Sequence, residues 1–182
     1  SSMRFSRFYP FLFALFTTAF CTAQPYWQKG DQLGYVGGFA TVQGQAEQIV
    51  NAHMDLDLGG SLFFTPKWAL GAEASTSWDP LTQSVNATTR AQYLLLGRSD
   101  LSHSLLADVH AGMGYHTSQT VMGTSFSSND VKLGLGLQYT WWISQGVGVY
   151  LWPQWSRTNG GPSGLWGWQF DVPIGVQWNW HR

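Results

Sequence analysis

Eight charged residues have the types and spacing that chemistry requires, because they recur at alternate positions of extended segments. The carboxylates are Asp55, Asp57, Glu73, Asp108 and Asp171, and the cations are Arg90, Arg98 and Lys132. Successive residues of a strand point to opposite faces, so these side chains share the polar faces of their segments. Unpaired buried charge is very costly, so we expect a network of paired charges that fills the interior. A narrow polar path for protons or small ions is the alternative.

The histidines offer two further chemistries. His110 and His116 follow Asp108 on one face, but they are too far apart along a strand to share a metal ion without a third ligand. An ester hydrolase needs a nucleophile, a base and an acid close together. The nearest string, Ser102-His103-Ser104, falls in an expected short turn. We therefore predict no catalytic, metal-binding or cofactor-binding residue.

The segment 166–180 shows what kind of element positions these residues. Its apolar residues stand at alternate positions, and polar or small residues stand between them. Such period-two alternation is typical of a strand with one apolar and one polar face. From Trp168 to Trp178 the strand is roughly 33 Å long. Tilted by about 40°, it spans about 25 Å, the height of the apolar band of an outer-membrane barrel.

The same alternation predicts eight antiparallel strands in an all-β, up-and-down transmembrane barrel. The expected strands cover 33–41, 53–64, 68–78, 90–98, 105–116, 131–144, 147–155 and 166–180. In the fourth of these, Leu94 and Leu96 share a face with Arg90. The links alternate in length: those at 65–67, 99–104 and 144–146 are short, and those at 43–51, 79–89, 117–129 and 156–165 are long. Short periplasmic turns and long external loops give this parity in outer-membrane barrels.

Composition supports the same class of fold. The chain has 182 residues, enough for one domain, and only 10% of them are charged, while it contains 11 Trp and 21 Gly. A soluble enzyme carries more charge, and a helical membrane protein would not have a mean hydropathy of -0.12. The net charge is -1 without a basic stripe, which excludes a nucleic-acid partner.

The N-terminal segment has the layout of a secretory signal peptide. Arg4 and Arg7 precede the apolar stretch 8–20, and small residues follow it up to Ala23. We predict cleavage after Ala23, which leaves residues 24–182 as the barrel domain. The single cysteine, Cys21, lies in the predicted signal, so the mature chain would contain no disulfide.

These features resemble the small eight-stranded outer-membrane barrels, the class of OmpX and of the OmpA transmembrane domain. The end of the predicted signal at Ala23-Gln24 also resembles secreted proteins of Bacteroidota, which have many chains of the "outer membrane protein beta-barrel domain" type. The resemblance covers the whole predicted mature chain and carries no site motif. The family usually ends on an aromatic residue, whereas here His181 and Arg182 follow Trp180.

The resemblance implies a location in a Gram-negative outer membrane, with membrane lipid and the barrel-assembly machinery as partners. A girdle of tryptophans is expected at the two membrane interfaces: Trp68, Trp78, Trp141, Trp155, Trp166, Trp168, Trp178 and Trp180. We expect a structural or interaction role, in which the external loops are candidates to bind an extracellular ligand. The alternatives are a lipid A-modifying hydrolase or acyltransferase and a narrow, porin-like channel.

Overall fold

The computed structural model describes residues 27–45, 48–78, 82–97, 102–119, 123–144, 146–160 and 166–180. Every regular element within these ranges is a β-strand. The strands are β1 (Gln32–Gln45), β2 (Gln48–Phe63), β3 (Trp68–Trp78), β4 (Thr82–Gly97), β5 (His103–Gln119), β6 (Ser125–Trp142), β7 (Val147–Leu151), β8 (Gln154–Gly160) and β9 (Trp166–Trp180). Among the described residues, no helix is long and apolar enough to cross a membrane.

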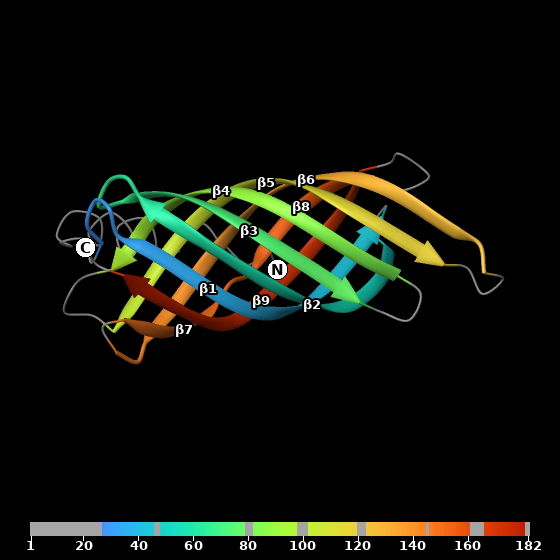
Figure 1. The fold of residues 1–182 in the computed structure, drawn as a ribbon. Helices are drawn as coiled ribbons and strands as arrows, with labels where there is room; N and C mark the ends of the chain where they lie inside the picture. The colour runs from blue at the N-terminus through green and yellow to red at the C-terminus, as the bar shows by residue number, and fades with distance from the viewer. Residues whose placement is uncertain are drawn as a thin grey trace, which may run out of the picture.

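The strands form one closed antiparallel ring (Figure 1). Neighbours in sequence pair with each other, and β1 closes the ring by pairing with β9. β7 and β8 both lie between β6 and β9, so they act as one interrupted strand, and the ring has eight positions. The interruption falls at Trp152 and Pro153, because proline has no N–H to donate to the ladder. The predicted all-β, eight-stranded, up-and-down barrel is confirmed.

The two faces of the barrel wall have opposite chemistry. In β9, Phe170, Ile174 and Trp180 are exposed on the outside, while Asp171 and Gln177 are buried inside. This is the face assignment that the alternation predicts. Across the described strands the exposed large side chains are almost all apolar, whereas most buried side chains are polar or charged. A water-soluble fold shows the reverse distribution.

The links that the sequence predicts as long are mostly strand. β1 continues to Gln45 and β2 begins at Gln48, so two residues separate them where nine were expected; β5 likewise continues to Gln119 and β6 begins at Ser125. The prediction of long loops was therefore wrong. Beyond the apolar band both faces of a strand meet water. A paired strand there does not need the alternation of apolar and polar residues that marks a strand in the sequence.

The barrel has two different ends, which we name by their connections. The links β2–β3, β4–β5 and β6–β7 define the turn end, and the links β1–β2, β3–β4, β5–β6 and β8–β9 define the hairpin end. At the hairpin end the β5–β6 pair projects beyond its neighbours, as the yellow β5 and the orange β6 at the right of Figure 1 show.

One β-bulge corrects the predicted faces of β4. The pairing of β4 with β5 is irregular between Leu94, which lies opposite Leu106, and Leu96, which lies opposite Leu105. Leu94 is therefore buried inside with Arg90, whereas Leu96 follows Leu105 to the other face. The extra residue reverses the alternation, so Leu94 and Leu96 do not share a face.

An apolar layer closes the turn end of the interior. Trp27, which precedes β1, is fully buried; it stacks on Phe63 at 4.6 Å between ring centroids and meets the edge of Trp142 at 5.4 Å. A tight turn holds it there, since Gly30 has φ of 98° and its N–H donates to the carbonyl of Phe63 at 2.7 Å. The layer consists of Trp27, Leu33, Phe63, Ala69, Leu94, Leu106 and Trp142.

Candidate functional site

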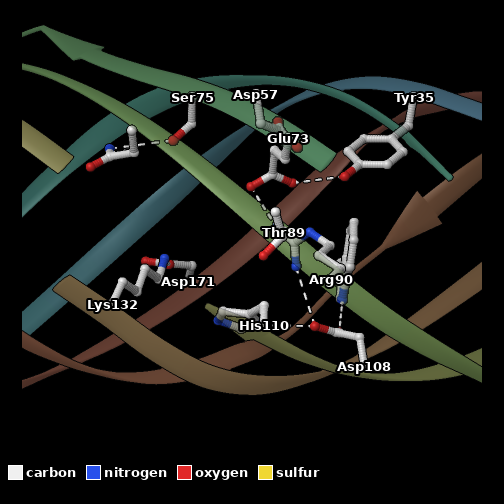
Figure 2. A network of polar contacts seen from close by, with 12 residues as sticks. Tyr35, Asp57, Glu73, Ser75, Thr89, Arg90, Asp108, His110, Lys132 and Asp171 are labelled. Atoms are coloured by element: carbon white, nitrogen blue, oxygen red, sulfur yellow. Dashed lines mark hydrogen bonds and ion pairs between the residues drawn. The ribbon is translucent and has the colours of Figure 1, made fainter. Parts of the chain in front are cut away.

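Arg90 stands at the centre of the charged interior (Figure 2). From β4, its Nη2 lies 2.5 Å from Oε1 of Glu73 on β3, and its Nη1 lies 3.3 Å from Oδ1 of Asp108 on β5. The guanidinium also lies over the ring of Trp152, 4.0 Å from the centroid. Cation–π contact and two carboxylates together compensate the desolvation of a cation that is almost completely buried.

Asp108 joins three groups to this centre. Its Oδ1 accepts hydrogen bonds from Arg90 and, at 2.8 Å, from Nδ1 of His110, and its Oδ2 accepts one from Nε1 of Trp152 at 2.7 Å. Hydrogen bonds to an ionised carboxylate are stronger than neutral ones and fix the positions of the side chains involved. Asp108 is therefore the best-connected carboxylate of the described interior.

Two tyrosines extend the cluster to the opposite wall. The hydroxyl of Tyr35 donates to Glu73 Oε2 at 3.1 Å, and the hydroxyl of Tyr150 donates to Asp57 Oδ2 at 3.1 Å. The two rings meet edge to face, 5.9 Å apart. Tyr150 fits because Gly37, on β1 beyond β9, has no side chain: a Cβ at that position would clash with the hydroxyl. Bulky residues against glycines thus fill the narrow lumen.

A second ion pair lies beyond this cluster. Nζ of Lys132 on β6 is 2.8 Å from Oδ2 of Asp171 on β9. Nε2 of Gln169 donates to both oxygens of that carboxylate at 2.9 Å. Figure 2 shows this pair apart from the chain of contacts that runs through Arg90.

An uncharged hydrogen-bond ladder separates the ionic cluster from the apolar layer. Gln92 lies on the inner face of β4 between Arg90 and Leu94, and its Nε2 donates to Oε1 of Gln138 at 3.3 Å. The ladder then passes through further bonds of 2.5 to 2.9 Å. Its members are Ser61, Gln92, Gln138, Gln177 and Thr140, all buried. Amide side chains both donate and accept, so they can bridge the lumen without adding charge.

The structure accounts for most of the charged residues that the sequence singles out. Asp57, Glu73, Arg90 and Asp108 fall in the cluster around Arg90, and Lys132 pairs with Asp171. Asp55 is half-buried on the same face of β2, and Arg98 lies outside the described residues. Tyr35, Tyr150 and Trp152 are not among the residues predicted from the sequence, although alternation with Val149 and Leu151 already places the last two on the inner face.

The hairpin end of the interior contains a histidine–acid pair with serines around it. Nε2 of His116 lies 3.0 Å from Oδ2 of Asp130, and their side chains are 31% and 13% exposed. Ser84 and Ser128 stand directly opposite His116 on the two neighbouring strands. His103, by contrast, contacts Tyr139 on the outer face at 2.5 Å. No group of three metal-ligating side chains occurs in the described ranges.

The eight tryptophans expected in the girdle all lie on the outer face of their strands. Trp68 packs against Tyr93 at 4.8 Å and Trp178 against Trp180 at 5.8 Å, both near the turn end. A second group lies toward the hairpin end and consists of Trp78, Trp155, Trp166 and Trp168. Their exposure ranges from intermediate for Trp168 and Trp178 to 58% for Trp78.

No family model matches the sequence, and no curated protein matches it either. Solved structures show the likeness. Neisserial surface protein A covers 82% of this chain and 98% of its own, with a TM-score of 0.64 and 7% identity. The match to Ail, the attachment invasion locus protein of Yersinia pestis, covers 84% of this chain and 100% of Ail, with a TM-score of 0.59 and 12% identity. The match to the outer membrane protein OprG from Pseudomonas aeruginosa covers 87% of this chain and 100% of OprG, with a TM-score of 0.56 and 14% identity. The chain therefore has the fold of the small outer-membrane β-barrels.

Proposed function

We propose that this chain is an integral outer-membrane protein with a non-conducting barrel, which serves a structural or interaction role by presenting its hairpin end outward. The observation that carries the proposal is the inverted wall. Leu70, Val109 and Ile174 are 55 to 61% exposed on the outside, whereas Asp108 and Asp171 are buried inside. Such an outer face is stable only against lipid. Barrel closure through β1 and β9 is the step that we assign to the barrel-assembly machinery.

Three features of the interior support a closed barrel. The apolar layer around Trp27 closes the turn end, the glutamine ladder crosses the lumen next to it, and the charges around Arg90 are paired. An ion would have to pass the apolar layer and break buried ion pairs. Both steps are costly in free energy. These features favour a plug over the alternative of a narrow channel.

The membrane location is tested by the gel mobility of the detergent-refolded chain with and without boiling. We expect the unboiled barrel to migrate differently from the boiled chain, because closed barrels resist detergent. Equal mobility, together with solubility in buffer without detergent, would contradict the proposal. Planar-bilayer recordings test the closed lumen: we expect no conductance steps, and regular steps would favour the channel.

A hydrolase is the second candidate, and one observation favours it. His116 and Asp130 form an acid–base pair at the hairpin end, with Ser84 and Ser128 opposite on the same face. In an acyl transfer, a serine hydroxyl attacks an ester carbonyl while the imidazole takes its proton and returns it to the leaving alcohol. A fluorophosphonate probe tests this role in the refolded barrel. Labelling lost in Ser84→Ala or Ser128→Ala would support a hydrolase, and no labelling would exclude it.

A further inference from the structure

The outer face of the described strands carries one fully charged residue, Arg157 on β8. Every described aspartate and glutamate of the strands points into the lumen, as do Arg90 and Lys132, and the remaining described lysines, Lys29 and Lys67, lie in turns. Arg157 is exposed, and it has no ion pair or side-chain hydrogen bond within the described part of the chain. An isolated cation on a lipid-facing surface marks a functional position.

Apart from Asn159, the neighbours of Arg157 on the outer face are apolar or aromatic. It stands opposite Leu133 on β6 and opposite Trp168 on β9 (Figure 1 shows β8 in the wall). The next outward residues of its own strand are Trp155 and Asn159. Directly opposite residues on one face lie about 5 Å apart, so the guanidinium projects from a surface that offers it aromatic rings and no anion.

The height of Arg157 places it at a membrane boundary. From Val147, where β7 leaves the turn end, to Arg157 is ten residues, or roughly 33 Å of strand. With a tilt of about 40° this rise is about 25 Å, the full height of an outer-membrane apolar band. Trp168 lies directly opposite Arg157 on β9, and Trp166 lies one outward position further toward the hairpin end, opposite Asn159, where an aromatic girdle meets lipid headgroups.

We propose that Arg157, with Trp166 and Trp168 beside it, binds the phosphate group of an anionic membrane lipid at the hairpin-end boundary of the bilayer. The proposal rests on the proposed membrane location. A planar guanidinium donates two parallel hydrogen bonds to phosphate oxygens, and a tryptophan accommodates both the acyl chains and the headgroup. The long side chain of Arg157 reaches from the apolar wall to the headgroups in the same way that lipid-facing arginines snorkel.

The test is the selectivity of the reconstituted chain for spin-labelled phosphatidylglycerol over spin-labelled phosphatidylcholine in phosphatidylcholine vesicles. We expect the full chain to restrict the anionic lipid more strongly, and Arg157→Gln to lose roughly fivefold of that preference. Arg157→Lys should retain part of the preference, because it keeps the charge and loses the planar fork. Asn159→Ala, two residues along the same face, is the matched control and should keep the full preference.

Other outcomes separate the two proposals. An unchanged preference in Arg157→Gln, in a barrel that still inserts and still shows heat-dependent mobility, would overturn the lipid site and leave the membrane location intact. Inorganic phosphate at about 10 mM, added at constant ionic strength, tests for a free anion as the ligand. Full loss of the preference would overturn a lipid-specific site in favour of a free anion. Absence of any motionally restricted lipid of either kind would overturn the membrane location itself.

Discussion

The turn end and the hairpin end of the lumen belong to the same ring of eight strand positions but are filled differently. At the turn end, the interior is apolar and aromatic around Trp27 and Phe63, and both are fully buried. At the hairpin end, it contains His116, Asp130 and serines, and His116 is 31% exposed. The ionic cluster around Arg90 lies between the two.

The difference shows how a polar interior is made stable. In the ionic cluster, Asp108 is buried and must be satisfied by protein groups, and it accepts three hydrogen bonds, one each from Arg90, His110 and Trp152. At the hairpin end, water can satisfy what the protein leaves open, so short side chains suffice. We therefore expect sensitivity to substitution to fall from the turn end toward the hairpin end.

The largest expected effect is that of Asp108→Ala. Removing this carboxylate leaves the buried Arg90 and His110 without their shared partner, which should lower the free energy of unfolding by about 4 kcal/mol. Urea unfolding in lipid vesicles, followed by gel mobility, measures it. Asp130→Ala makes the same chemical change at the hairpin end and should cost less than about 1 kcal/mol. Equal losses would contradict the gradient.

Trp27→Ala should lower the free energy of unfolding by about 3 kcal/mol, because it leaves a cavity between Phe63 and Trp142. It also weakens the closure of the turn end, so intermittent conductance should appear in planar bilayers where the unchanged barrel shows none. Trp78→Ala on the outer face is the control and should not change conductance. A stable, silent Trp27→Ala barrel would show that the apolar layer does not close the lumen.

Asp171→Ala should destabilise the barrel by about 2 kcal/mol, since it strands the ammonium of Lys132, which is only partly exposed. Combining it with Lys132→Met removes the stranded charge and should restore part of the loss. Ser125→Ala at the start of β6 should be nearly neutral. Comparable losses at Asp171 and Ser125 in the same denaturation assay would refute the paired interior.

The smallest effect is expected at the hairpin end itself. His116→Gln removes the pairing with Asp130, but both side chains reach solvent, so the free energy of unfolding should change by less than about 1 kcal/mol. Differential denaturation against the unchanged chain measures it. A loss as large as that of Asp108→Ala would mean that this end is as tightly closed as the other.

Much of the wall is readable from the sequence because one face of each strand meets an apolar medium. In β9 and β6 the alternation assigns each residue to its face, down to the buried Gln138 and Asp171. Where that constraint ends, prediction fails. The strands extend into the expected long links, and the bulge before Leu96 depends on pairing with β5, which no local pattern reveals.

The candidate site divides in the same way. The sequence places Asp57, Glu73, Arg90 and Asp108 on polar faces. Because an unpaired buried charge is costly, these residues must find partners. Which partners they find is a property of the closed ring: Tyr150 reaches Asp57 across 93 positions of sequence. Trp27 precedes the first strand, and its role depends on a turn at Gly30 that folds it back into the barrel.

By itself, the sequence determined the class of fold and the two faces of its wall, because period-two alternation is a local consequence of strand geometry and of the medium on each side. Only the tertiary structure decided the ion-pair partners, the closure of one end of the lumen and the isolation of Arg157 among aromatic neighbours. Each of these depends on which strands lie side by side and with what register, and closure of the ring sets both at once.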